Sequence, residues 1–251
     1  MGDRDIVVSG SFNTRDLGGY RTKQGNLAWR KTFRSGNMAH VDQSGIAALK
    51  QLGVTRVIDL RSQKERDAEP DPFGSAYGIE LISISLFDDL NPHQLPQSNA
   101  LLDLYIHALE TQGPVFVDVL SKIADCSGGA LFHCTAGKDR TGLIAALLLS
   151  LSGVSHADIV EDYALTADRL GPLLQTIEKT AQAFNLSKSD YMPMPECNPS
   201  TMLRTLDWLD HCFDGAEGYL RSHGLTDDNL RQLRSRWSLV DQRMISCAAP
   251  D

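Results

Sequence analysis

The stretch Ala130-Leu131-Phe132-His133-Cys134-Thr135-Ala136-Gly137-Lys138-Asp139-Arg140-Thr141-Gly142 leads directly into an apolar run over residues 143–151. This order predicts a short buried strand, a tight loop and the start of a helix. The backbone N–H groups of such a loop point inward at the helix N-terminus, where they form an anion site. Cys134 stands at the strand end of the loop and Arg140 at the helix end.

These residue types at this spacing favour covalent phosphate chemistry. A cysteine beside a helix N-terminus and positive groups ionises readily, and its thiolate is a nucleophile. Arg140 offers a planar fork of donors that matches two phosphate oxygens, and the Thr141 hydroxyl can donate to the cysteine sulfur. A nucleotide-binding loop is excluded, because Phe132 stands where its first glycine belongs and Asp139 where its Ser/Thr belongs. The loop therefore predicts a cysteine-dependent phosphatase.

The motif His133-Cys134-x5-Arg140-Thr141 resembles the signature of the protein tyrosine phosphatases. Its inner residues, 136–142, are similar to those of the bacterial tyrosine phosphatase B-type enzymes, whose signature resembles that of the phosphoinositide phosphatases. Asn-Thr-Arg-Asp-Leu-Gly-Gly-Tyr at 13–20, Phe-Arg-Ser-Gly at 33–36 and Ile-Asp-Leu-Arg at 58–61 also match that subgroup. The resemblance covers most of the chain and implies a single cysteine-phosphatase-like domain over residues 1–251.

Composition narrows the class of protein further. A chain of 251 residues fits one large domain or two small ones. The formal net charge of −8 argues against a nucleic-acid partner, and no apolar run approaches the roughly 18 residues of an integral membrane segment. The charged N-terminus is unlike a secretory signal, so we expect a cytoplasmic protein, or one exported without a cleavable signal. Five cysteines without a Cys-x2-Cys pair favour a reducing compartment over a zinc site. We expect a monomer.

Strands and helices alternate through the first half of the chain. The pattern predicts strands at 6–8, 55–60, 80–86 and 131–133, and helices at 43–52, 99–109 and 114–124. It also predicts a hairpin in which residues 20–22 and 27–30 flank a turn over 23–26. Asp42 is a good N-cap, and Ser62 with Glu65 forms a capping box. We therefore predict an α/β fold with a central, largely parallel sheet flanked by helices. Ligand sites in such sheets lie at the C-terminal ends of strands, which places Asp59 and Arg61 near the loop.

From Ser155 onward the predicted structure is almost entirely helical. Helices are expected from Ser155 and over 169–184, 200–213, 216–222 and 227–237, with a proline-containing linker over 186–199. In the resembling family, helices in this part of the chain form a lid over the active site. The sequence leaves open whether residues of about 155–200 form a helical lid and linker or pack on the flank of the sheet.

The resemblance implies roles for individual residues. Cys134 is the predicted nucleophile, and Arg140 with the loop N–H groups holds the phosphate oxygens. Lys138 either adds positive charge suited to multiply phosphorylated head groups or is an ordinary exposed lysine. Arg15 and Asp16 either line the active site or form a surface ion pair. The residues expected to contact substrate are His133, Thr135, Ala136, Gly137, Lys138, Thr141, Asp59, Arg61, Arg15 and Asp16; no step requires a metal or other cofactor.

The leaving oxygen needs a proton, and four aspartates compete for that role. Asp139 comes first, because no Trp-Pro-Asp triplet occurs upstream and because it resembles the loop aspartate to which the family assigns the acid role. Asp88 or Asp89 is the second choice, and Asp59 is the third.

The predicted function is the hydrolysis of a phosphorylated protein or phosphoinositide. Phosphotyrosine is the first expectation, with phosphoserine, phosphothreonine and phosphoinositides as further substrates. Two rivals remain, a phosphate-reading binding module that has lost catalysis and a sulfur transferase or arsenate reductase with a similar cysteine loop. Intact Cys134 and Arg140 argue against the first, and Lys138-Asp139 against the second.

Overall fold

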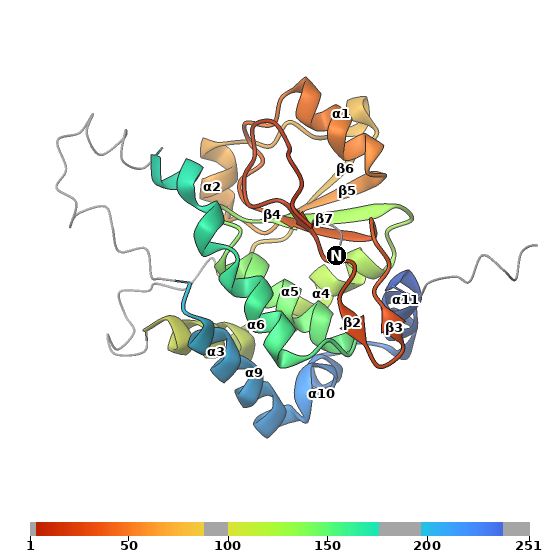
Figure 1. The fold of residues 1–251 in the computed structure, drawn as a ribbon, viewed down its shortest axis with the longest axis vertical. Helices are drawn as coiled ribbons and strands as arrows, with labels where there is room; N and C mark the ends of the chain where they lie inside the picture. The colour runs from red at the N-terminus through yellow and green to blue at the C-terminus, as the bar shows by residue number, and fades with distance from the viewer. Residues whose placement is uncertain (1–3, 88–99, 176–196, 238–251) are drawn as a thin grey trace, which may run out of the picture.

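The computed structural model describes residues 4–87, 100–175 and 197–237, and it contains a five-stranded sheet in the order β1-β4-β7-β5-β6 (Figure 1). Strands β4 (Thr32–Ser35), β7 (Gly129–His133), β5 (Val54–Asp59) and β6 (Glu80–Ser83) run parallel. Only β1 (Arg15–Asp16), at one edge, is antiparallel. The predicted α/β architecture, a largely parallel sheet between helices, is confirmed.

Strand β7 forms the centre of the sheet, and all five of its residues are buried. Its side chains alternate between faces, so Ala130 and Phe132 join one apolar cluster and Leu131 joins another. The smaller cluster packs under α1 (Gln43–Gln51), which Figure 1 shows on the opposite side of the sheet from α4 and α5. The larger cluster is built with α3 (Ala100–Thr111), α4 (Gly113–Ala124), α5 (Asp139–Leu151), α6 (His156–Ala164), α9 (Pro199–Phe213), α10 (Gly215–Ser222) and α11 (Asp227–Trp237).

The helix starts predicted from local sequence are confirmed. Asp42 accepts a hydrogen bond from the Gly45 N–H at 2.9 Å and caps α1. The capping box of Ser62 and Glu65 opens α2 (Gln63–Ala68) with both of its hydrogen bonds present. Ser155 caps α6. Each cap satisfies backbone N–H groups that have no partner within the helix.

Of the two short elements predicted near the N-terminus, the hairpin forms and the strand at residues 6–8 does not. The hairpin forms from β2 (Arg21–Thr22) and β3 (Gly25–Asn26). Its turn has two residues and not four, so the second strand begins two residues before the predicted position at 27–30. The strand expected at residues 6–8 is wrong. In this segment only Asp5 forms a bridge, with Arg15. The Ile6 N–H still donates to the Thr14 carbonyl oxygen at 3.0 Å, but a turn closed by the hydrogen bond from the Ser11 N–H to the Val8 carbonyl oxygen ends the pairing. Val7 is consequently 93% exposed, while Val8 turns inward to the smaller apolar cluster.

The predicted helical second half is confirmed for α6, α9, α10 and α11. The described residues also contain two 3₁₀ turns, η1 (Ser75–Tyr77) and η3 (Ala167–Arg169), and residues 171–175 are helical within the helix predicted over 169–184. Helix α6 packs against α5 and α9, with Ile159, Asp162 and Tyr163 buried. Residues 176–196, which hold the end of the helix predicted over 169–184 and most of the linker predicted over 186–199, lie outside the described residues, so the lid stays a prediction. None of the described helices has both the length and the apolar character needed to span a bilayer.

Candidate active site

The loop between β7 and α5 begins where three parallel strands end together. Ser35 of β4 and Asp59 of β5 are both in register with His133, the last residue of β7. Gly137 has a positive φ of 67°, and a Cβ there would lie 2.5 Å from the Ser35 carbonyl oxygen. Only glycine therefore allows the loop to fold against the end of β4.

Cys134 and Thr141 are brought together by this loop. Cys134 is 2% exposed, and the Thr141 hydroxyl, from the first turn of α5, donates to its Sγ atom at 3.1 Å. A hydroxyl at this distance stabilises negative charge on sulfur. On the other side of the loop, the Asn37 N–H donates to the Thr135 carbonyl oxygen at 3.0 Å and ties the loop to the segment after β4.

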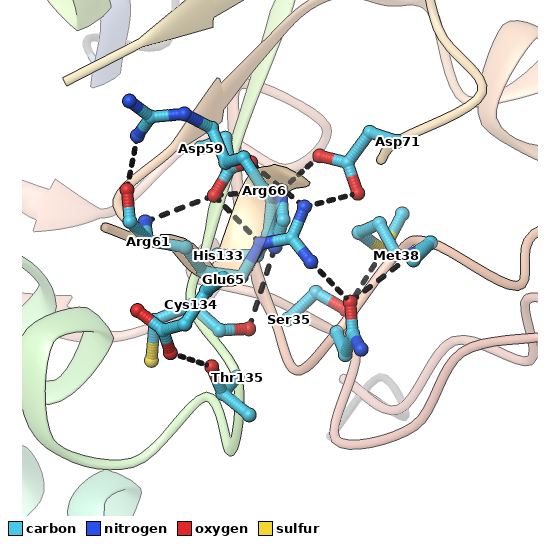
Figure 2. Close-up of polar contacts among 12 residues, drawn as sticks. Ser35, Met38, Asp59, Arg61, Glu65, Arg66, Asp71, His133, Cys134 and Thr135 are labelled. Carbon is cyan, nitrogen blue, oxygen red and sulfur yellow. Dashed lines mark hydrogen bonds and ion pairs between the residues drawn. The ribbon is translucent and has the colours of Figure 1, made fainter. Parts of the chain in front are cut away.

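The Arg140 guanidinium is held by Glu65, the third residue of α2. Its two terminal nitrogens donate to the two Glu65 carboxylate oxygens at 2.7 and 2.8 Å. The Thr135 hydroxyl donates to the same carboxylate, as the dashed line in Figure 2 shows. Burial would raise the pKa of Glu65, but the hydrogen bonds and charge of Arg140 outweigh it, and the pKa lies well below its ordinary value. Glu65 thus fixes the plane of the arginine beside the loop.

Asp139 is the first residue of α5, and its carboxylate meets groups from two directions. The Tyr105 hydroxyl donates to Asp139 Oδ1 at 2.6 Å, and Tyr163 lies behind Tyr105 with 2.9 Å between the two hydroxyl oxygens. The Lys138 Nζ atom lies 3.4 Å from the same Oδ1. The side chain of Lys138 is fully buried, so the alternative of an ordinary exposed lysine is wrong.

Two side chains hold the outward-facing carbonyl groups of the loop. The Asn13 amide nitrogen donates to the carbonyl oxygens of Ala136 and Gly137, each at 3.1 Å. An Arg34 terminal nitrogen donates to the Gly137 oxygen at 2.7 Å. Because these carbonyl oxygens are bound on the outside, the peptide groups that carry them are fixed in orientation.

Arg15 lies in a buried ion cluster centred on Asp162 of α6. Its Nε atom donates to Asp162 Oδ1 at 2.9 Å, and Arg34 donates to Oδ2. The Tyr20 hydroxyl donates to Oδ1 at 3.1 Å. Burial opposes ionisation of Asp162, but the two arginines outweigh it and hold its pKa well below the ordinary value. The cluster connects α6 to the loop through Arg34, which donates to the Gly137 carbonyl oxygen, and through Asn13, whose side-chain oxygen accepts a hydrogen bond from Arg15.

A second buried network lies under His133. The His133 Nε2 atom is 2.8 Å from an Asp71 carboxylate oxygen, and Nδ1 is 3.4 Å from the Cys134 carbonyl oxygen. Figure 2 shows Arg61 between Asp59 and Asp71, and its nitrogens donate to both carboxylates at 2.8 Å. Burial opposes ionisation of Asp59, yet Arg61 and His133 lower its pKa.

This network contains a set of atoms with metal-ligand chemistry. Carboxylate oxygens of Asp59 and Asp71 and a ring nitrogen of His133 lie within 4.8 Å of one another. The Arg61 guanidinium already neutralises both carboxylates, so the residues fit an internal ion pair better than a cation site.

The remaining candidates lie away from the loop or outside the described residues. Asp16 accepts hydrogen bonds from the backbone N–H groups of Gly18 at 2.8 Å and Arg30 at 2.7 Å, so its carboxylate holds the segment around β1 and not the loop. Arg15 and Asp16 are both buried and have different partners, so the surface ion pair is wrong. Asp88 and Asp89 fall outside the described residues.

Sequence reasoning missed several residues that surround the loop. Glu65 appeared only as a helix cap, although α2 starts directly after β5 and therefore lies at the same edge of the sheet as the loop. That position was a usable signal, because the first turn after a strand end faces the ligand side of an α/β sheet. Asn13 and Arg34 lie in the segments 13–20 and 33–36 that match the resembling subgroup, which was a signal for them. The other missed residues carried no comparable signal; they are Asp71, Tyr105, Asp162 and Tyr163.

Known proteins resemble this chain over nearly its whole length. Residues 6–238 match the model of the tyrosine phosphatase family. A tyrosine-protein phosphatase of Nostoc commune is 34% identical over 220 residues, covering 83% of this chain and 74% of that protein. The triple specificity protein phosphatase PtpB of Mycobacterium tuberculosis is 25% identical, covering 90% of this chain and 96% of that one.

Among solved structures, the core catalytic domain of the PP-IP phosphatase SIW14 from S. cerevisiae is similar at 17% identity, with a TM-score of 0.41. The match covers 64% of this chain and 79% of that domain. The family match and the relatives confirm the resemblance that the sequence motif carried. Because the family model matches residues 6–238 and a relative is 34% identical, the chain belongs to the tyrosine phosphatase family.

Proposed function

We propose that this phosphatase removes phosphate from phosphotyrosine through a cysteinyl-phosphate intermediate. The observation that carries the proposal is the hydrogen bond of 3.1 Å from the Thr141 hydroxyl to Cys134 Sγ, at the start of a helix. The core residue Cys126 also has a threonine hydroxyl near its sulfur, that of Thr55 at 3.3 Å, so the bond to Cys134 points to catalysis because of where it lies. Placed beside the Arg140 guanidinium, the arrangement is suited to a nucleophile that meets a phosphate.

The first chemical step transfers the phosphoryl group to the enzyme. Cys134 Sγ attacks phosphorus in line with the ester oxygen, so an S–P bond forms as the P–O bond breaks. The loop N–H groups and Arg140 hold the three non-bridging oxygens and stabilise their charge. Asp139 gives its proton to the departing oxygen, which leaves as the free phenol or alcohol.

The second step regenerates the free enzyme. Water attacks the phosphorus of the cysteinyl phosphate, the S–P bond breaks, and inorganic phosphate leaves. Asp139, now ionised, takes the proton from the attacking water. The Thr141 hydroxyl donates to the sulfur and stabilises it as it leaves as a thiolate.

Phosphotyrosine is the proposed principal substrate, and phosphoserine, phosphothreonine and phosphoinositides are further candidates. The Nostoc commune relative is named a tyrosine-protein phosphatase and the Mycobacterium tuberculosis relative a triple specificity phosphatase, which supports this order. Lys138 would add charge for head groups with several phosphates once it leaves Asp139.

The proposal is tested by phosphate release from a phosphotyrosine peptide, a phosphoserine peptide and phosphoinositide vesicles. Cys134→Ser is expected to abolish release while phosphate binding persists, because only the thiolate does covalent chemistry. Cys126→Ser is the matched control, since Cys126 is also buried but bonds to Gly128 and Gly129 away from the loop. Activity of Cys134→Ser above about a tenth of wild type would contradict the assignment. Binding of phosphate without release from any substrate would favour a phosphate-reading module.

A further inference from the structure

Two buried tyrosines form a chain of hydroxyl groups that ends on Asp139. Tyr105 lies on α3 and Tyr163 on α6, and both side chains are almost completely inaccessible to solvent. The Tyr105 hydroxyl is 2.6 Å from Asp139 Oδ1, and the Tyr163 hydroxyl is 2.9 Å from that of Tyr105. The two rings pack edge to face with 6.4 Å between their centroids. These two hydrogen bonds link α6 to α3 and α3 to the carboxylate on α5.

The direction of the hydrogen bonds in this chain follows from counting protons. A hydroxyl has one proton to donate, and Tyr105 uses it on Asp139, so its oxygen accepts from Tyr163. Burial and the nearby charge of Asp139 raise the pKa of Tyr105 and of Tyr163 above the ordinary value, which keeps both hydroxyl groups protonated. Packing alone would be served equally well by phenylalanine, which buries the same ring without a polar atom.

The hydrogen bonds from Tyr163 through Tyr105 to Asp139 make the two oxygens of the Asp139 carboxyl group different. Oδ1 accepts from Tyr105 and lies 3.4 Å from the Lys138 Nζ atom, whereas Oδ2 has no hydrogen-bond partner among the described residues. When the carboxyl group is protonated, the proton therefore resides on Oδ2, the oxygen left open to a substrate. A general acid must present its proton within hydrogen-bond reach of the leaving oxygen, so a fixed carboxyl plane favours the transfer.

We propose that Tyr105, supported by Tyr163, is a positioning residue that orients the Asp139 carboxyl group for protonation of the leaving oxygen. The inference rests on the proposed role of Asp139 as general acid. Neither tyrosine touches the reacting atoms. Their effect is expected in the steps that move the proton, and not in the binding of phosphate.

The test compares phenyl phosphate with p-nitrophenyl phosphate, because the acidic nitrophenol departs with little help from an acid. Tyr105→Phe is expected to lower kcat/KM about tenfold on phenyl phosphate and less than about threefold on p-nitrophenyl phosphate. Inhibition by inorganic phosphate should be unchanged. In an Asp139→Asn background, Tyr105→Phe should add no further loss, since it acts through the same carboxyl group.

Two further variants separate positioning from stability. Tyr163→Phe should show the same substrate pattern more weakly, because it removes the outer hydroxyl and leaves the Tyr105–Asp139 bond intact. Tyr219→Phe is the matched control, since its buried hydroxyl donates at 2.7 Å to the Leu109 carbonyl oxygen on α3, away from Asp139. Thermal unfolding of all variants checks that each one folds.

Each outcome has a defined meaning. Equal losses on both substrates for Tyr105→Phe, no loss on either, or an additive loss in the Asp139→Asn background would overturn the inference. The proposed acid is tested separately by Asp139→Asn alone, which should slow phenyl phosphate far more than p-nitrophenyl phosphate. If that single variant shows no substrate difference, the general-acid assignment itself fails.

Discussion

Asp162 provides the sharpest test of how the loop is supported. It is 1% exposed, and its carboxylate accepts hydrogen bonds from Arg15, Arg34 and Tyr20. Asp162→Asn keeps the shape of the side chain but removes the charge. Two buried guanidinium groups then have no carboxylate partner in this cluster.

The expected cost follows from the energetics of buried charges. Removing one partner of a buried ion pair destabilises a protein by about 3–5 kcal/mol, because the remaining charge loses its compensation. The free energy of unfolding of a domain is about 5–15 kcal/mol, so Asp162→Asn should remove a large share of it. Burial and the charge of Arg15 already lower the pKa of Arg34, which shows that the site is unfavourable for a second cation.

Activity should fall along with stability. Arg34 also donates to the Gly137 carbonyl oxygen at 2.7 Å, so a displaced arginine disturbs the loop peptide that it holds. Urea unfolding and kcat/KM on p-nitrophenyl phosphate measure the two effects. Glu161→Gln is the matched control, because it makes the same carboxylate-to-amide change on the exposed face of α6. A loss below about 1 kcal/mol for Asp162→Asn, similar to an exposed substitution, would refute the reasoning.

The same cluster predicts the dependence of stability on pH. The pKa of Asp162 is lower in the folded protein than in the unfolded chain, so its contribution is complete above the unfolded value of about 4 and declines as the pH falls below it. Asparagine does not titrate. The difference in unfolding free energy between wild type and Asp162→Asn should therefore narrow from about pH 5 to about pH 3. A constant difference across that range would contradict the assignment of the charge to Asp162.

Three further substitutions test the loop itself. Arg140→Lys should lower kcat/KM more than about tenfold, because a point charge cannot replace a bidentate fork; a smaller loss would mean that the loop N–H groups suffice. Glu65→Gln should also lower kcat/KM, on the order of tenfold, since it weakens the two charge-assisted bonds that hold Arg140, whereas Asp67→Asn on the same helix should have little effect. Lys138→Ala should reduce phosphate release from multiply phosphorylated lipids more than from p-nitrophenyl phosphate; equal losses would indicate a role in loop structure alone.

Local sequence was sufficient to predict the loop at the candidate active site. The strand, loop and helix that carry Cys134, Arg140 and Thr141 are contiguous, so their order alone predicts that they meet. Hydrophobic periodicity and cap residues such as Asp42 and Ser62 are equally local signals, and the sheet class and most helix positions followed from them. The strand predicted at residues 6–8 does not form, because the backbone pairing ends at Ile6 and a turn begins at Val8.

The surroundings of the loop depended on tertiary packing. Glu65 reaches Arg140 from 75 positions away, and Asp162 reaches Arg15 from 147 positions away. Tyr105 and Tyr163 sit on helices whose apolar patterns predict burial but do not indicate which polar group each hydroxyl will meet. A buried hydrogen-bond donor or charge needs a partner. The sequence predicts which polar groups are buried, but it does not predict which groups they contact. Which carboxylate pairs with which arginine is decided only when the helices pack against the sheet.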